Sequence, residues 1–505
     1  MTTATAHPPC RAEAALWIDG ASVPGEGEIV REIRNPADPG ELVAAVREAT
    51  PDQVAAACAS AQRAFRGWAG TPPPDRARVL FRFRELLEAN YVELARLIVR
   101  ENGKLLSEAK GDVRRGIDVV EFACGIPSLL MGETLPNVAS LVDASCVREP
   151  LGVCVGIPPF NFPAMIPLWT MPLAVACGNT YILKPAEKAP LTGTRLAQLF
   201  NKAGLPKGVV NVLHGGADVT QRLLANPSVK AVTFVGSTPV AQQIYSQCAA
   251  NGQRVQALGG GKNFLLVMPD ANLEQSVPAL VGSCFGCAGQ RCLAGSVVVA
   301  IGDKAQQDRV IEGFVAGARA IRLGDGFDEQ AGMGPLHSAA HKQKVEQAIA
   351  AGEKAGAKLL LDGRGAKAAA RPNGHYLGAT VFDVADLESP LVAEEIFGPV
   401  VAVLRAKDLE EAIDFANRSR FGNSASIFTQ SGAAARTFRA GIQCGMLGLN
   451  LGVPAPMASF SFGGWKKSLF GDTHVYGPDA IHFYTRKKVI TERWFGAVPP
   501  HEGWV

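Results

Sequence analysis

The chain has 505 residues, of which 47% are hydrophobic and 19% charged, and this composition excludes a mostly disordered protein. Its 50 basic and 47 acidic residues leave a net charge of only +3, which predicts no broad surface for nucleic acid or for an anionic membrane. Residues 1–15 lack a basic stretch followed by an apolar one, so no secretory signal is predicted and we expect a cytoplasmic protein.

The eleven cysteines lie between Cys10 and Cys444 without the spacing of a disulfide framework. This pattern favours free thiols in a reducing compartment. Cys284, Cys287 and Cys292 are close enough in sequence to suggest zinc, but no second Cys or His pair follows at ligand spacing. We therefore expect no metal site.

The first elements are helical. Apolar spacing predicts amphipathic helices at 52–68, 75–101 and 104–125. Residues 151–183 contain no charged side chain, but five prolines interrupt them, which argues against a helix that spans a membrane. This stretch predicts a buried strand, a loop and a proline-kinked helix.

From about residue 152 the sequence predicts strands that alternate with helices. Strands are predicted at 152–157, 181–184, 209–213 and 230–235, with helices at 190–203 and, after Gly236-Ser237, to about residue 250. A second unit of the same style has strands at 264–268, 296–301, near 400–404 and near 446–450, and helices at 273–286, 305–321 and 338–355. Such alternation predicts an α/β fold with parallel sheets, which bind nucleotides at the carboxyl ends of their strands.

The C-terminal segment 477–491 shows alternating apolar residues. It predicts an extended tail, and because an exposed alternating strand is an edge without a partner, we expect it to pair across subunits.

Cys292 is the candidate nucleophile, because glycines and small residues around it allow a substrate to approach closely. The neighbouring Arg291 would favour its thiolate, whereas the alternative is a buried structural cysteine. Cys284 and Cys287 fall within an apolar helical pattern and are interpreted as core.

Polar residues that follow predicted strands are candidates for binding. Asn161, held between aromatic residues and prolines, suits an oxyanion donor or is simply a turn residue. Lys184 and Glu187 could hydrogen-bond an adenosine ribose, and Glu187 would repel a 2′-phosphate and so favour NAD over NADP. The alternative is that the two residues form a solvated ion pair without a role in binding. The Phe234–Thr238 turn has one glycine where the dinucleotide-binding fingerprint needs three, so it is a weak signal for a nucleotide. The acidic and aromatic Glu394–Pro399 turn does not by itself indicate a binding site.

Taken together and in this order, these segments resemble the aldehyde dehydrogenase superfamily over essentially the whole chain. Four segments are similar to its CoA-acylating methylmalonate-semialdehyde dehydrogenase branch: 159–169, 268–272, 289–292, and 471–477 with 483–485. The resemblance implies a Rossmann-like NAD-binding domain (1–125 and 149–258), an oligomerisation hairpin (126–148), a catalytic α/β domain (259–476) and a C-terminal oligomerisation tail (477–505). It also implies a homodimer or homotetramer.

The resemblance further implies roles for single residues. Cys292 would be the nucleophile and Asn161 the oxyanion donor, and Arg115 and Arg291 would recognise a substrate carboxylate. The residues implied to bind NAD are Phe160, Lys184, Glu187, Phe234, Gly236, Ser237, Glu395 and Phe397. Without the resemblance, Arg115 would be interpreted as a surface arginine. We assign carboxylate recognition to Arg115 and not to Arg114, because Arg115 occupies the arginine position of the Gly-Asp-Val-x-Arg-Gly pattern of this branch.

One departure bears on the reaction. Hydrolytic members of the superfamily carry a glutamate that activates water, and here Leu258 falls at that position, where the CoA-acylating branch usually has asparagine. Leucine cannot take a proton, so thiol attack on an acyl-enzyme should outrun hydrolysis. We therefore expect NAD-dependent, CoA-acylating oxidative decarboxylation of methylmalonate or malonate semialdehyde to propionyl-CoA or acetyl-CoA. The alternatives are a hydrolytic aldehyde dehydrogenase that releases a free acid and a non-catalytic oligomeric scaffold that binds NAD.

Overall fold

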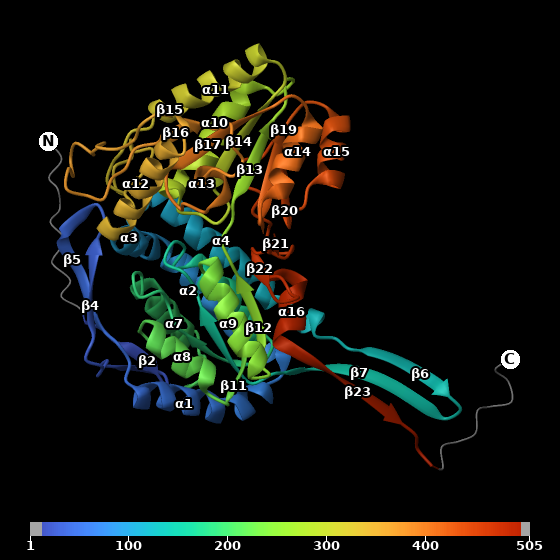
Figure 1. Ribbon diagram of the computed structural model, residues 1–505. Helices are drawn as coiled ribbons and strands as arrows, with labels where there is room; N and C mark the ends of the chain where they lie inside the picture. The colour runs from blue at the N-terminus through green and yellow to red at the C-terminus, as the bar shows by residue number, and fades with distance from the viewer. Residues whose placement is uncertain (1–12, 496–505) are drawn as a thin grey trace.

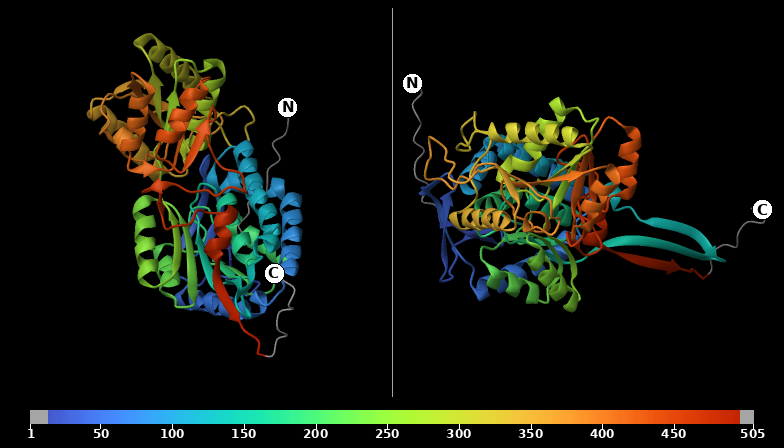
Figure 2. Two further views of the ribbon diagram at one scale, coloured as in Figure 1. Left: turned by 90° about the vertical axis from the view of Figure 1, so that its right-hand side faces the viewer. Right: turned by 45° about the horizontal axis from the view of Figure 1, so that its top comes forward.

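The computed structural model describes residues 13–495, which form two α/β lobes and a projecting arm (Figures 1 and 2). The first lobe holds an eight-stranded sheet in the order β22 (Leu469–Phe470), β12 (Arg254–Leu258), β11 (Val229–Val235), β8 (Val153–Ile157), β9 (Thr180–Leu183), β10 (Val210–Val212), β2 (Leu16–Ile18) and β3 (Ala21–Val23). Its five central strands are parallel, and the edge strands are antiparallel.

The second lobe holds a seven-stranded sheet. Its order is β15 (Lys358–Leu361), β16 (Thr380–Asp383), β17 (Val400–Ala406), β14 (Gly295–Ile301), β13 (Asn263–Val267), β19 (Ser424–Phe428) and β20 (Met446–Leu449). All neighbours are parallel except β15 and β16. The predicted α/β class with parallel sheets is confirmed.

Helices cover both sheets, as expected where strands are buried on both faces. Those of the first lobe are α1 (Pro51–Ala69), α2 (Pro73–Ala89), α3 (Tyr91–Asn102), α4 (Leu106–Cys124), α5 (Ile126–Leu129), α6 (Met165–Ala176), α7 (Leu191–Lys202), α8 (Ala217–Ala225), α9 (Thr238–Ala250) and α16 (Gly477–Tyr484). Those of the second are α10 (Leu273–Phe285), α11 (Lys304–Arg319), α12 (Ala339–Lys354), α13 (Pro390–Ala393), α14 (Leu409–Arg418) and α15 (Gly432–Gly441). No helix among residues 13–495 is long and apolar enough to cross a bilayer.

The predicted helix at 75–101 is wrong in one respect, because it is two helices, α2 and α3. They break at Asn90, whose side-chain Nδ2 donates to the carbonyl of Leu86 at 2.7 Å. An asparagine that bonds the backbone in this way competes with helix propagation. The periodic pattern continues across the break because both helices face one core.

The C-terminal segment also differs from its prediction. Residues 477–484 form helix α16, with Pro478 in its first turn and Ile481, Phe483 and Tyr484 buried. Only β23 (Thr485–Glu492) is extended, and it pairs antiparallel with β7 of its own chain. Pairing across subunits stays a prediction, and residues 496–505 of the predicted tail lie outside the described part.

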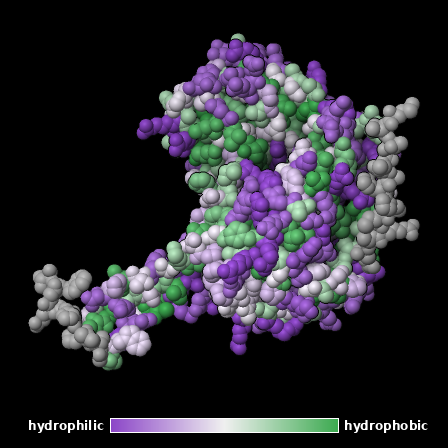
Figure 3. All heavy atoms as spheres, turned by 180° about the vertical axis from the view of Figure 1, so that it is seen from behind, coloured by the Kyte–Doolittle hydropathy of each residue, from purple (hydrophilic) through white to green (hydrophobic). Residues whose placement is uncertain are grey.

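The arm is a three-stranded sheet in the order β23, β7 (Val142–Pro150) and β6 (Glu133–Ala139). It extends away from the first lobe in Figure 1 and in the right-hand view of Figure 2. Apolar side chains lie among polar ones on its surface (Figure 3), including Leu135, 63% exposed, and Val489, 70% exposed.

Several small strands were not predicted. They include the N-terminal sheet β1 (Glu13–Ala14), β5 (Asp38–Arg47) and β4 (Val30–Asn35), and the pair β18 (Phe421–Gly422) and β21 (Trp465–Lys466). They are short or only partly buried, so their apolar periodicity is weak.

The two sheets meet end to end. Strands β8, β9, β11 and β12 direct their carboxyl ends to one edge of the first sheet, and the chain passes from Leu258, the last residue of β12, to Asn263, the first of β13, in a few residues. The amino edge of the second sheet therefore faces the carboxyl edge of the first. The candidate residues after β8, β9 and β11, and Cys292 before β14, lie along this junction.

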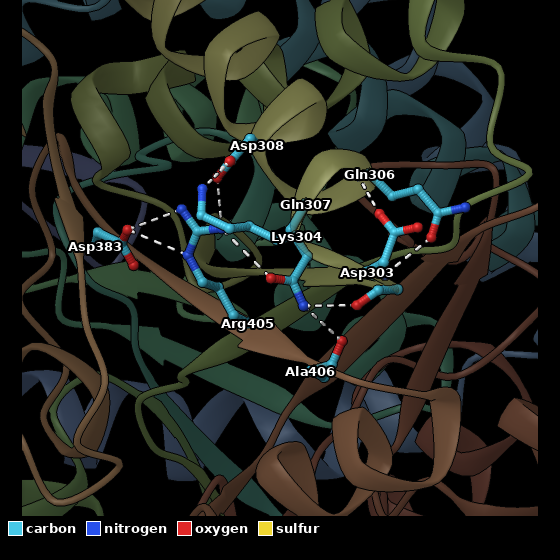
Figure 4. A network of polar contacts seen from close by, with 9 residues as sticks. Asp303, Lys304, Gln306, Gln307, Asp308, Asp383, Arg405 and Ala406 are labelled. Carbon is cyan, nitrogen blue, oxygen red and sulfur yellow. Dashed lines mark hydrogen bonds and ion pairs between the residues drawn. The ribbon is translucent and has the colours of Figure 1, made fainter.

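A polar network closes the opposite edge of the second sheet (Figure 4). Arg405 on β17 bonds Asp308 of α11 at 2.7 Å and Asp383 of β16 at 3.1 Å, while Gln307 donates to the carbonyl of Ala406. Strand β14, which separates this edge from Cys292, has seven residues, or about 20 Å. The network therefore joins α11 to the sheet and takes no part in the junction.

Candidate active site

Cys292 lies in a turn whose backbone is tightly held. Helix α10 ends at Phe285, and Cys287 and Ala288 then adopt left-handed conformations, with φ of 52° and 53°. The carbonyl of Cys292 accepts hydrogen bonds from the side-chain amides of Asn263 and Asn423, each at 2.8 Å. These bonds hold the Cys292 backbone from Asn263, the first residue of β13, and from Asn423, which directly precedes β19.

Cys292 opens into a cavity of about 320 Å³ between the lobes. Its walls are mainly apolar, with Phe162, Met165, Trp169, Leu293, Phe462 and Tyr476 among them. Cys287, interpreted from sequence as part of a helical core, is buried but lies in the left-handed turn and lines the same cavity. Cys284 is buried in α10, as predicted.

Both predicted arginines line this cavity. Arg115 on α4 places Nη1 2.9 Å from the sulfur of Met457, while Arg114 turns away to bond Glu88. Arg291 donates from Nη2 to the carbonyls of Gly282 and Ser283, near the C-terminus of α10. Arg291 is thus anchored by carbonyls at the negative end of a helix, and Arg115 is the more available cation.

The environment of Cys292 does not favour a resting thiolate, contrary to the expectation from Arg291. Burial raises the pKa of the thiol to about 12, the charge of Glu395 adds to this, and Arg291 only partly opposes it. At pH 8 the thiolate fraction is then about 10⁻⁴. The thiol of Cys292 is therefore almost entirely protonated in this environment.

We expect the alkylation rate of Cys292 by iodoacetamide, without other ligands, to rise about tenfold per pH unit from pH 7 to 9. The sign follows from the raised pKa, because the thiolate fraction grows with pH at every value below the pKa. Mass spectrometry of the modified peptide against pH measures it. A plateau with an inflection below pH 8 would contradict the buried-thiol environment.

Asn161 is joined to the nucleophile turn across the lobes. Its Nδ2 donates to the carbonyl of Gln290 at 2.9 Å, two residues before Cys292. Its Oδ1 is buried and has no hydrogen-bond partner among the described residues. The structure therefore brings the predicted oxyanion donor next to the segment that carries the thiol.

Leu258 ends β12, is 3% exposed and belongs to the apolar cluster against which Cys292 packs. Three carboxylates do line the cavity, all from α4: Glu108, Asp112 and Asp118. Glu108 and Asp112 each accept backbone N–H groups. Sequence reasoning missed these acids because they lie more than 170 residues before Cys292, although their spacing places them on one helix face with Arg115.

The residues predicted for an adenosine ribose gather after β9. Lys184 is buried and donates from Nζ to the carbonyl of Gly215 at 2.8 Å; burial lowers its pKa to about 8, which Glu187 and Glu48 oppose. A Cβ added at Gly216 would lie 3.1 Å from Oε2 of Glu187 and 3.1 Å from Nη2 of Arg31. Arg31 and Glu48 form an ion pair there that was not predicted.

In the turn between β11 and α9, the ring of Phe234 lies against Gly236. A Cβ added at Gly236 would lie 2.4 Å from Cζ of Phe234, so a larger residue there would require the ring to move. Ser237 is exposed at the N-cap of α9, and its side chain makes no capping bond within the described chain. The N–H groups of this first turn suit an anionic group.

Glu395 and Phe397 lie at the junction from the side of the second lobe. Glu395 Oε1 accepts the N–H of Gly261 at 3.0 Å, and burial raises the pKa of its carboxyl. Phe397 has a φ of 57° and lies edge-on to Phe160, with ring centroids 6.1 Å apart. Residues from four predicted segments thus border one junction that ends at Cys292.

Comparisons with known proteins agree with this geometry. The model of the aldehyde dehydrogenase family matches residues 23–490. A malonate-semialdehyde dehydrogenase of Geobacillus thermodenitrificans is 48% identical over 478 residues, 95% of this chain and 97% of the relative. One from Halalkalibacterium halodurans is also 48% identical, over 95% of this chain and 98% of the relative.

Solved structures give the same answer. The methylmalonate-semialdehyde dehydrogenase of Oceanimonas doudoroffii superposes with a TM-score of 0.93 at 45% identity, over 95% of this chain and 98% of that one. A Sinorhizobium meliloti protein that carries the same name provisionally, complexed with NAD, gives 0.94 at 43% identity over 96% and 98%. The chain belongs to the aldehyde dehydrogenase family.

Proposed function

We propose that this protein is an NAD-dependent, CoA-acylating dehydrogenase that converts malonate or methylmalonate semialdehyde to acetyl-CoA or propionyl-CoA. The observation that carries the proposal is a cavity that combines the Cys292 thiol with two arginines, next to a leucine where a water-activating base would lie. The names of relatives at 43–48% identity support it.

The reaction begins at sulfur. The Cys292 thiolate adds to the aldehyde carbon, and the Asn161 amide and the Cys292 N–H stabilise the oxyanion of the hemithioacetal. Loss of hydride leaves a thioester on Cys292. Arg115, with Arg291 behind it, orients the β-carboxylate, and its departure as CO₂ leaves a thioester enolate that is then protonated.

NAD, when bound, supplies the acceptor for that hydride. The junction fits it, because Lys184 and Glu187 suit the adenosine ribose, the free N–H groups at α9 suit the pyrophosphate, and Glu395 and Phe397 suit the nicotinamide ribose. The protein holds the reacting carbon of the substrate between the Cys292 sulfur and the position of the nicotinamide ribose at Glu395 and Phe397.

The fate of the thioester depends on which nucleophile can lose its proton. Water needs a general base, and Leu258 offers none, whereas the thiol of CoA ionises far more readily. Attack by CoA releases acetyl-CoA or propionyl-CoA and returns the Cys292 thiolate. A hydrolytic dehydrogenase remains the alternative.

The decisive experiment follows NADH from malonate semialdehyde with and without CoA. We expect a burst of about one NADH per site without CoA and sustained turnover only when CoA is added. Steady turnover that is indifferent to CoA, with malonate or acetate as product, would establish the hydrolytic alternative.

Arg115→Leu is expected to lower kcat/KM for malonate semialdehyde by about 10²-fold, because a charge-assisted bond to the carboxylate is lost. Propanal, which has no carboxylate, should react within about threefold of the wild-type rate. Arg114→Leu is the matched control, since Arg114 bonds Glu88 outside the cavity. Equal losses for both aldehydes in Arg115→Leu would refute carboxylate recognition.

Glu187→Ser is expected to tighten NADP binding by about tenfold or more, because a repulsive carboxylate leaves and Arg31 remains near the ribose position. Fluorescence titration with NADPH measures the Kd. Adding Arg31→Gln to this variant should remove the gain. Unchanged NADPH affinity in Glu187→Ser would show that other groups select the cofactor.

We further infer that the lobe built on the eight-stranded sheet is the NAD-binding domain and the lobe built on the seven-stranded sheet is the catalytic domain, with the arm of β6, β7 and β23 joining subunits of a homodimer or homotetramer. The exposed apolar side chains of the arm support this assembly. The free cysteines of the described residues support a reducing, cytoplasmic location.

A further inference from the structure

A buried ion pair lies directly behind the predicted oxyanion donor. The side chain of Lys104 is 2% exposed and that of Asp112 is not exposed at all, and their charged atoms are 3.0 Å apart. Neither residue is assigned a part in the proposed reaction. Their charges must therefore be explained by what else they contact.

Lys104 holds one end of the Asn161 segment. Its Nζ donates to the backbone carbonyl of Asn161 at 2.6 Å and lies 4.0 Å from the ring centre of Phe162. The ammonium thus fixes the peptide plane that leads out of Asn161 and the ring that follows it.

Asp112 holds the other end. Its Oδ1 accepts the N–H of Met165 at 2.6 Å, at the first residue of α6. The N-cap residue of that helix, Ala164, has no side-chain oxygen, so Asp112 on α4 supplies the missing cap from another helix. Burial raises the pKa of the Asp112 carboxyl, and Lys104 opposes this most strongly.

Lys104 and Asp112 therefore hydrogen-bond the backbone at the two ends of residues 161–165. A buried ion pair contributes little net stability compared with apolar packing of similar volume, so stability alone does not account for it. Fixing an oxyanion donor does, because an error of about 1 Å in a catalytic group can cost about 10²-fold in rate.

We propose that Lys104 and Asp112 are positioning residues, which hold the Asn161 amide where the oxyanion forms beside Cys292. The proposal rests on the proposed function only in taking Cys292 as nucleophile and Asn161 as donor. It predicts that the ion pair affects chemistry through Asn161 and through no independent route.

A double-mutant cycle tests this prediction. The variants are Lys104→Met, Asn161→Ala and their combination, and the readout is the rate constant of the first NADH burst from malonate semialdehyde without CoA. We expect Asn161→Ala to slow the burst by about 10²- to 10³-fold and Lys104→Met by about 10²-fold. Added to Asn161→Ala, Lys104→Met should have no further effect.

Multiplied effects in the double variant would overturn the proposal, because a merely structural lysine weakens the enzyme whether or not Asn161 is present. Lys104→Arg should recover part of the burst rate, since it keeps a buried cation. Lys110→Met, which removes a partly exposed lysine on α4 beside Asp112, is the matched control and should stay within about twofold of the wild type.

Thermal unfolding of each variant shows whether it folds. If Lys104→Met does not, Asp112→Asn replaces it in the same cycle, because its side-chain oxygen can still accept from Met165 while the charge is lost. A wild-type enzyme that gives no burst of NADH refutes the proposed function, and the cycle is then read from the burst of p-nitrophenolate released when p-nitrophenyl acetate acylates Cys292, a step that needs no NAD. A burst with multiplied effects refutes the positioning role alone.

Discussion

Cys292→Ala is expected to lower turnover of malonate semialdehyde by about 10⁴-fold or more and to abolish the NADH burst. The reason is that the thioester from which both later steps proceed forms on the Cys292 sulfur. NAD affinity, measured by fluorescence titration, should change little, because the ribose candidates lie after β9 and before β17.

The matched control is Cys287→Ser. Cys287 is the second thiol of the cavity, but its N–H is tied to Glu108 at 2.5 Å in a left-handed turn. We expect this variant to keep the burst at one NADH per site. A burst lost in Cys287→Ser and retained in Cys292→Ala would reverse the assignment of the nucleophile.

Leu258→Glu is expected to raise CoA-independent turnover by about 10²-fold and to release a free carboxylic acid, because it restores a general base for water. Leu258 is 3% exposed, so burial would raise the pKa of the new carboxyl and make it a stronger base. Product analysis by mass spectrometry, with and without CoA, measures the change.

Leu258→Gln is the control for this change, since glutamine has nearly the same size and takes no proton. It should leave CoA-free turnover at the wild-type level. If glutamine and glutamate raised it equally, water access and not a missing base would explain the CoA requirement. The NADH burst of each variant verifies that the active site is intact.

The fold class and most of its elements could be read from local patterns. Short apolar runs alternating with helices predicted both parallel sheets, and the observed strand β8 and helix α9 lie within one or two residues of their predictions. The same pattern misled at 75–101 and 477–491. In the first case a side-chain bond of Asn90 breaks the helix, and in the second buried residues at helical spacing were taken for alternation.

The candidate site, like the fold, was predicted in part from the sequence. The motifs near Asn161 and Lys184 follow the ends of strands, whereas Cys292 precedes β14, and the topology of the two sheets brings all three to one junction. The pKa of Cys292 could not be foreseen, because the adjacent Arg291 suggested a lowered value while burial raises it.

By itself, then, the amino-acid sequence determined the α/β architecture and the candidate nucleophile, since both depend on neighbours along the chain, and its resemblance to a known family marked Leu258 as a position that lacks a base. Only the tertiary structure decided how the site is held. Lys104, Glu108 and Asp112 meet loops that lie 50 to 180 residues further on. Desolvation and such long-range bonds arise when distant segments pack, and no local pattern records them.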